Sequence, residues 1–181
     1  VEHMAFRGTR RFPGRAIDAY LQSVGMRLGE DANAATSYDE TIYRLTIPTG
    51  RRAVVDSAIM ILADWAHAVT FDSAEVIRER GVVLEEWRLG QGAQTRIANA
   101  QRPIVLRGSR YAVRLPIGDR ATIEGADPVR LRRFYHDWYR PDLMAVIVVG
   151  DVDRDAVAAM IKQHFASLSS PSPERPRPTF D

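Results

Sequence analysis

The strongest constraint on the fold is the pattern of apolar side chains in residues 51–69. These side chains recur with helical spacing on or near one face, which predicts an amphipathic helix packed against the rest of the chain. The apolar positions are Val54, Val55, Ala58, Ile61, Leu62 and Trp65. The triplet Phe71-Asp72-Ser73 then provides an N-cap for a second long helix, which is expected to run through Trp87 to about Ala100.

Strand patterns stand between the helical ones. Residues 32–48 have the composition of two strands joined by a polar turn at 37–39, and the valine-rich run Met144–Val149 indicates a buried strand. Further helical patterns occupy residues 15–24, 128–139 and 153–165. Together these segments predict an α+β fold in which a mixed or antiparallel sheet packs against helices.

The chain is expected to form a single domain over residues 1–168. Residues 169–181 contain Pro171, Pro173 and Pro176 among serines and charged residues, a composition typical of a linker toward a following domain.

Charge and cysteine content exclude several function classes. The chain has no cysteine, which excludes a thiol nucleophile, a disulfide framework and a cysteine-based zinc site. Its 25 basic and 23 acidic residues give a net charge of +2, and the two signs alternate along the second long helix, which argues against a nucleic-acid partner. No apolar run approaches the roughly 18–20 residues of a membrane span.

Three groups of residues could carry chemistry. The first is Glu2-His3, the second comprises Glu79, Glu85 and Glu86 on the second long helix, and the third is the strand formed by Asn33, Ala34, Ala35 and Thr36. Glu79 and Glu86 are almost two helical turns apart and therefore point to nearly the same side, whereas Glu85 points about 100° away from Glu86. Read alone, such carboxylates are typical of a solvated helix face with ion pairs.

The amino-acid sequences of several segments change that interpretation. The sequence from Val1 to Thr9 resembles the end of the inverted zinc motif, His-x-x-Glu-His, and the residues that follow it in the M16 metallopeptidases (insulinase, pitrilysin and mitochondrial processing peptidase). The resemblance covers nearly the whole chain, and the segments Phe12-Pro13-Gly14 and Ser37-Tyr38-Asp39-Glu40-Thr41 look most like the bacterial PqqL-type zinc proteases. Four further segments match the family in order: Asn33–Ser37, Glu79–Trp87, Pro116–Gly118 and Val148–Asp153.

The resemblance implies a Zn²⁺ cofactor and a role for each group. His3 and Glu86 would be metal ligands, with Glu85 as the alternative to Glu86. Glu2 would be the general base that takes a proton from the attacking water, and Glu79 would support the site. Residues Asn33–Thr36 would bind an extended peptide at a strand edge, although a simple buried hairpin is the other interpretation.

The resemblance also implies that the zinc motif is incomplete here. Its first histidine would stand four residues before His3, two positions before Val1, so we expect a fragment that lacks the first strands of the domain and is inactive alone. The parent would be a zinc endopeptidase of peptides or unfolded small proteins, completed by a second M16-type half and located in the periplasm or cell envelope of a bacterium. The alternative is a non-catalytic M16-like half that acts as a binding or assembly subunit.

Overall fold

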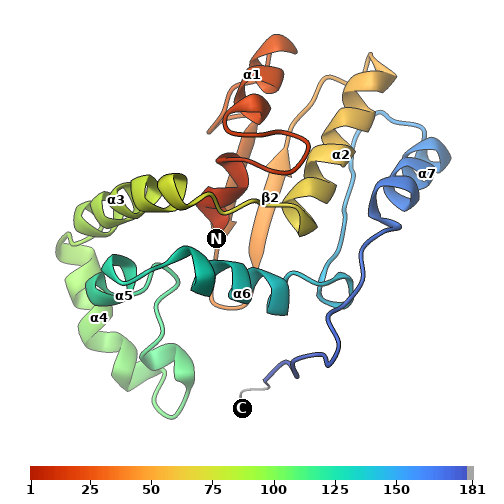
Figure 1. The fold of residues 1–181 in the computed structure, drawn as a ribbon. Coiled ribbons are helices and arrows are strands. Elements are labelled where there is room, and N and C mark those ends of the chain that lie inside the picture. The colour runs from red at the N-terminus through yellow and green to blue at the C-terminus, as the bar shows by residue number, and fades with distance from the viewer. Residues whose placement is uncertain (179–181) are drawn as a thin grey trace.

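The computed structural model describes residues 1–178 and consists of helices around one β-hairpin (Figure 1). Strands β1 (Ala32–Thr36) and β2 (Thr41–Leu45) pair antiparallel, and Thr36 lies directly opposite Thr41. The helices and short 3₁₀ turns are η1 (Glu2–Phe6), α1 (Ala16–Ser23), α2 (Arg52–His67), α3 (Ser73–Leu89), α4 (Ala93–Val105), η2 (Arg110–Ala112), α5 (Arg120–Glu124), α6 (Pro128–Trp138), η3 (Pro141–Leu143) and α7 (Arg154–Phe165). The α+β class, with helices packed on a small antiparallel sheet, is confirmed.

Helix α2 is the centre of the packing. Its indole at Trp65 is almost fully buried and stacks obliquely on Tyr43 of β2, with ring centroids 5.4 Å apart. On another side, Val55 and Ile59 pack with Val157 and Met160 of α7 in a second, smaller apolar cluster. The apolar residues of the amphipathic segment 51–69 therefore belong to one helix that contacts both the hairpin and α7.

Two polar contacts fix the start of the chain on α2. The indole nitrogen of Trp65 donates to the carbonyl of Ala5 at 2.9 Å, inside η1. Asp64, fully buried, accepts from the Thr9 hydroxyl at 2.6 Å and from the Arg11 guanidinium at 2.7 Å. Because η1 carries Glu2 and His3, these contacts set the position of both candidate residues.

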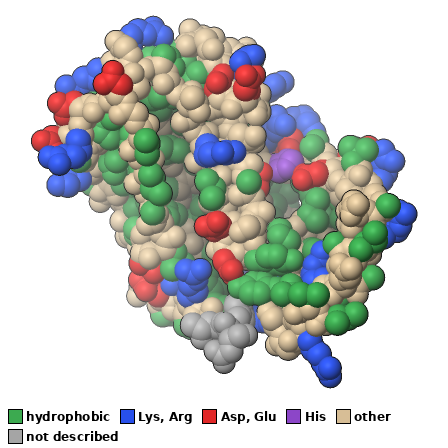
Figure 2. Space-filling model, turned by 180° about the vertical axis from the view of Figure 1, so that it is seen from behind, with side chains coloured by type: hydrophobic (Ala, Val, Ile, Leu, Met, Phe, Trp, Pro, Cys, Tyr) green, Lys and Arg blue, Asp and Glu red, His purple; other side chains and the backbone are tan. Residues whose placement is uncertain are grey.

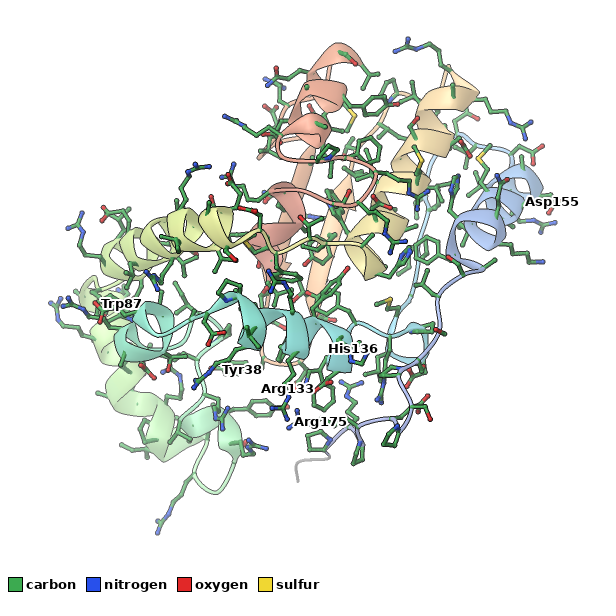
Figure 3. All side chains as sticks on the ribbon, in the orientation of Figure 1. Tyr38, Trp87, Arg133, His136, Asp155 and Arg175 are labelled. Atoms are coloured by element: carbon green, nitrogen blue, oxygen red, sulfur yellow. The ribbon has the colours of Figure 1, made fainter. Side chains whose placement is uncertain are left out.

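Replacing Trp65 by phenylalanine is expected to lower the free energy of unfolding by about 2 kcal/mol. The smaller ring leaves the buried Ala5 carbonyl without its donor and opens a small void. Equilibrium unfolding in urea measures the change. Trp87→Phe is the matched control, since Trp87 lies at the outer part of α3 and is only half-buried (Figure 3). Equal losses in the two variants would contradict this account.

Helix α3 begins as the sequence predicts and ends earlier. The Asp72 side chain accepts from the backbone nitrogens of Ala74 and Glu75, which is the expected N-cap. The helix stops at Leu89 rather than near Ala100, and a separate helix, α4, follows Gly92. Glycine lowers helix propensity, and Gly90 and Gly92 stand on either side of the break.

The prediction of a buried strand at Met144–Val149 is wrong. The segment forms no strand among residues 1–178, and its side chains are largely in solvent, with Ile147 82% and Val149 91% exposed. β-Branched residues favour extended backbone, but a strand also needs a neighbour for its N–H and C=O groups. No described segment pairs with this run.

Part of the proline-rich tail is bound to α6. The buried Arg140 side chain donates to the Arg175 carbonyl at 2.7 Å, and the Arg175 guanidinium lies 3.2 Å from Asp137 and over the ring of Trp138. Figure 3 shows Arg175 below α6, near Arg133 and His136. The linker assignment remains a prediction, and residues 179–181 of it lie outside the described part. Among the described residues, no helix is long and apolar enough to span a membrane.

Candidate metal and peptide site

The candidate site lies where η1, β1 and α3 meet. Within η1, Met4 and Ala5 are buried and anchor the turn, whereas Glu2 and His3 face a small cavity of about 170 Å³. Asn33 of β1 and Glu79 of α3 also line this cavity. Members of all three groups predicted from the sequence therefore line this cavity, although they lie far apart along the chain.

Both ring nitrogens of His3 face carboxylates of α3. Nδ1 lies 2.9 Å from Oε2 of Glu79, and Nε2 lies 3.5 Å from Oε2 of Glu86. An ionised carboxylate only accepts hydrogen bonds, so Glu79 favours the tautomer with its proton on Nδ1. The Nε2 lone pair then points toward the Glu86 carboxylate. On the face drawn in Figure 2, a histidine lies between acidic side chains beside a hollow.

The two α3 carboxylates differ in their surroundings. The Glu79 side chain is 6% exposed, and its second oxygen forms an ion pair with Nε of Arg7 at 2.6 Å. The Glu86 side chain is 60% exposed. Glu79 is thus held between Arg7 and His3, whereas Glu86 faces open space beside His3.

The structure separates Glu85 from Glu86. Glu85 accepts two hydrogen bonds from the guanidinium of Arg88, at 2.5 and 2.8 Å, one turn along the same exposed face. This pairing lowers the pKa of the Glu85 carboxyl and raises that of Arg88. Of the two neighbouring glutamates, Glu86 is therefore the one that faces His3, as the helical geometry predicts.

Glu2 is held by the hairpin. Its Oε2 accepts a hydrogen bond of 2.5 Å from the hydroxyl of Thr36, the last residue of β1. Glu2 also lies within electrostatic reach of the half-buried phenols of Tyr43 and Tyr139, whose hydroxyls are 3.0 Å apart. Burial raises the pKa of both phenols, which moves it further above physiological pH.

Strand β1 offers only part of its outer edge. The edge at Ala32 is covered, because its N–H and C=O bond to the turn at Arg27 and Gly29. The N–H of Ala34 is capped by the side-chain oxygen of Asn33 at 2.8 Å. Backbone groups alternate sides along a strand, so the outward groups left for an added peptide are the C=O of Ala34 and the backbone groups of Thr36.

The donor set of this site is small. Residues 1–178 contain no group of three or more His, Asp or Glu side chains placed to hold a metal ion. His3 and Glu86 supply one nitrogen and one carboxylate, donor types that Zn²⁺ accepts, and these two atoms lie 3.5 Å apart. The pair fits part of a zinc site.

Arg7 is the residue that sequence reasoning missed. It stands four residues after His3, and its guanidinium closes the pair with Glu79. The sequence shows a basic residue one turn after the candidate ligand His3, but it does not show that this residue pairs with Glu79, which lies on α3. Other histidines bond elsewhere: His67 lies 2.6 Å from the carbonyl of Ala63, and His164 lies 2.9 Å from the carboxylate of Asp56.

Comparison with known protein families identifies the family to which this fold and this arrangement of histidine and glutamates belong. Residues 1–102 match the family described as Insulinase (Peptidase family M16), and residues 127–181 match the one described as Peptidase M16 inactive domain. The chain belongs to the M16 peptidase family.

Individual relatives are zinc proteases by name. The chain is 43% identical over 168 residues to the Probable zinc protease PqqL of Escherichia coli. The aligned residues make up 93% of this chain and 18% of that protein. It is 40% identical over 166 residues to the protein of the same name in Haemophilus influenzae, covering 92% of this chain and 18% of that protein. The chain therefore spans about a fifth of the length of these relatives.

The solved structures agree on the fold. The crystal structure of the first half of the periplasmic protease PqqL from Escherichia coli superposes with a TM-score of 0.91 at 41% identity, over 97% of this chain and 38% of that one. Pitrilysin, at 19% identity and a TM-score of 0.75, shares the fold.

Proposed function

We propose that this chain supplies the base and two of the metal ligands of a zinc-dependent endopeptidase that cleaves peptides or unfolded small proteins. The observation that carries the proposal is the double contact of His3. Its Nδ1 is held by buried Glu79, so its Nε2 faces Glu86, with Glu2 on the same turn of chain. The protease names of the relatives support this assignment.

His3 and Glu86 would hold Zn²⁺, which supplies Lewis-acid polarisation of a peptide carbonyl. Glu79 fixes the tautomer and orientation of the His3 ring, as carboxylates behind metal-binding histidines do. Arg7 balances the buried charge of Glu79 and keeps that carboxylate turned toward the ring. The third ligand would be the first histidine of the family motif, and it would come from polypeptide outside this chain.

Glu2 acts as the general base in this proposal. One of its oxygens is bonded to Thr36, which leaves the other oxygen to take a proton from water at the cavity. The extended substrate would add to the outer edge of β1 from Ala34 to Thr36 through backbone hydrogen bonds. Asn33, whose side chain caps Ala34, would have to move aside for a peptide to reach that nitrogen.

The proposal also includes a second half of the enzyme and a cellular location. A second M16-type half, in the same polypeptide or as a subunit, would close over the peptide. The location proposed is the bacterial periplasm, by analogy with the Escherichia coli relative that is called a periplasmic protease.

A second candidate function is a non-catalytic half that binds peptides or assembles with an active partner. The presence of Glu2, His3, Glu79 and Glu86 in one site favours the enzyme.

Peptide hydrolysis by the full-length parent polypeptide tests the proposal. We expect cleavage of a fluorogenic peptide that stops on treatment with a chelator and returns with Zn²⁺, whereas the 181-residue chain alone is inactive. Robust, chelator-sensitive cleavage by the chain alone would contradict the expected inactivity of the fragment. Absence of cleavage by a zinc-loaded parent would instead favour the binding subunit.

A further inference from the structure

The hydroxyl of Thr36 is directed at the candidate base rather than at the open strand edge. We infer that Thr36 is a positioning residue whose side chain holds the Glu2 carboxylate rather than contacting the peptide. The inference rests on the proposed function of Glu2. It separates the task of the Thr36 side chain from that of the strand backbone, which is proposed to bind the peptide.

The geometry of the hairpin separates these tasks. Side chains alternate between the two faces of a strand, so Ala32, Ala34 and Thr36 share one face and Asn33 and Ala35 share the other. The first face packs inward, since Ala32 is buried and Tyr43, the partner of Ala34 on β2, contacts the ring of Phe6 at 6.5 Å between centroids. Thr36 therefore points to the side of the sheet on which η1 lies.

A second hydroxyl fixes the orientation of the first. The Thr41 oxygen lies 3.1 Å from the Thr36 oxygen across the strand pair, and both residues occupy the same position of the register. The Thr36 proton is donated to Glu2, so the Thr36 oxygen accepts from Thr41. Thr41 also contacts the phenol of Tyr139, which connects this pair of threonines to the tyrosine pair.

The chemical consequence concerns the direction of the carboxylate. Glu2 has several rotatable bonds and stands near the start of a short 3₁₀ turn, which by itself fixes its side chain poorly. A hydrogen bond to Oε2 holds the plane of the carboxylate and leaves Oε1 for proton transfer. Displacement of a catalytic group by about 1 Å is enough to slow a reaction on the order of 100-fold.

The test uses Thr36→Val in the full-length parent polypeptide, because valine keeps the branched shape and removes the hydroxyl. We expect kcat to fall about 10- to 100-fold, with KM within about threefold of wild type and the zinc content per chain unchanged. Thr36→Ser restores kcat to within about threefold. Thr36→Ala carries the same expectation as valine if the valine variant does not fold. Thr46→Val, an exposed position just beyond β2, is the matched control and keeps wild-type kcat.

A rise in KM at constant kcat would overturn the inference, because it is the signature of lost ground-state binding. So would a serine variant as slow as the valine variant. The double variant Glu2→Gln with Thr36→Val should be no slower than Glu2→Gln alone, since Thr36 acts through Glu2. If Glu2→Gln is inactive and Thr36→Val is fully active, only this inference fails. If Glu2→Gln keeps wild-type activity, the proposed role of Glu2 fails, and the inference fails with it.

Discussion

Replacing Glu2 by glutamine in the full-length parent polypeptide is expected to lower kcat for peptide hydrolysis by about 10²- to 10⁴-fold, the range that a general base contributes. The amide keeps the size of the side chain and an oxygen that can still accept from Thr36. It cannot take a proton from water. Zinc content and the urea midpoint of unfolding should therefore remain those of the wild type.

Steady-state kinetics on a fluorogenic peptide, together with zinc analysis of the same samples, check this result. Glu40→Gln is the matched control, since Glu40 is an exposed carboxylate in the turn of the same hairpin. Loss of activity in both variants would indicate a general effect of negative charge near the site. A Glu2→Gln variant with wild-type kcat would remove Glu2 from the role of base.

Replacing Glu86 by glutamine is expected to weaken zinc binding by the parent polypeptide by at least about 100-fold. The neutral amide is a poor ligand, and the remaining protein donors hold the ion less firmly. Glu85→Gln is the matched control because it changes the adjacent residue, which is paired with Arg88 on the exposed face of α3. Its zinc affinity should stay within about threefold of wild type.

Competition with a chromophoric chelator measures both affinities. Equal losses in the two variants would indicate that α3 acts through its overall charge. A larger loss in Glu85→Gln than in Glu86→Gln would contradict the orientation of the helix in this structure. Either result would remove Glu86 from the proposed ligand set.

The local pattern of the chain was sufficient to predict the start of α3 and the direction of its carboxylates, although not the end of the helix. Asp72 fixes where the helix starts, and the seven-residue interval between Glu79 and Glu86 then places both on the side that meets η1. Capping and helical period act over a few residues and are therefore readable in sequence. The hairpin at 32–45 was predictable for the same reason.

Contacts between distant segments could not be read in this way. The bond between Thr36 and Glu2 and the ion pair between Arg7 and Glu79 join residues that lie on different elements. Neither residue type nor spacing marks them, because the packing of η1 on α2 decides which side chains meet. The Met144–Val149 run shows the opposite error, because a strong local preference for extended backbone finds no strand to pair with among residues 1–178.

The central claim is that His3 and Glu86 share one zinc ion while Glu79 holds the far side of the His3 ring. A crystal structure of the zinc-loaded parent polypeptide, with anomalous diffraction measured at the zinc edge, tests it most directly. We predict an anomalous peak at roughly 2.0–2.2 Å from both Nε2 of His3 and a carboxylate oxygen of Glu86, with Glu79 still bonded to Nδ1. A peak bound instead by Glu79 or Glu85, or one remote from His3, would contradict the account.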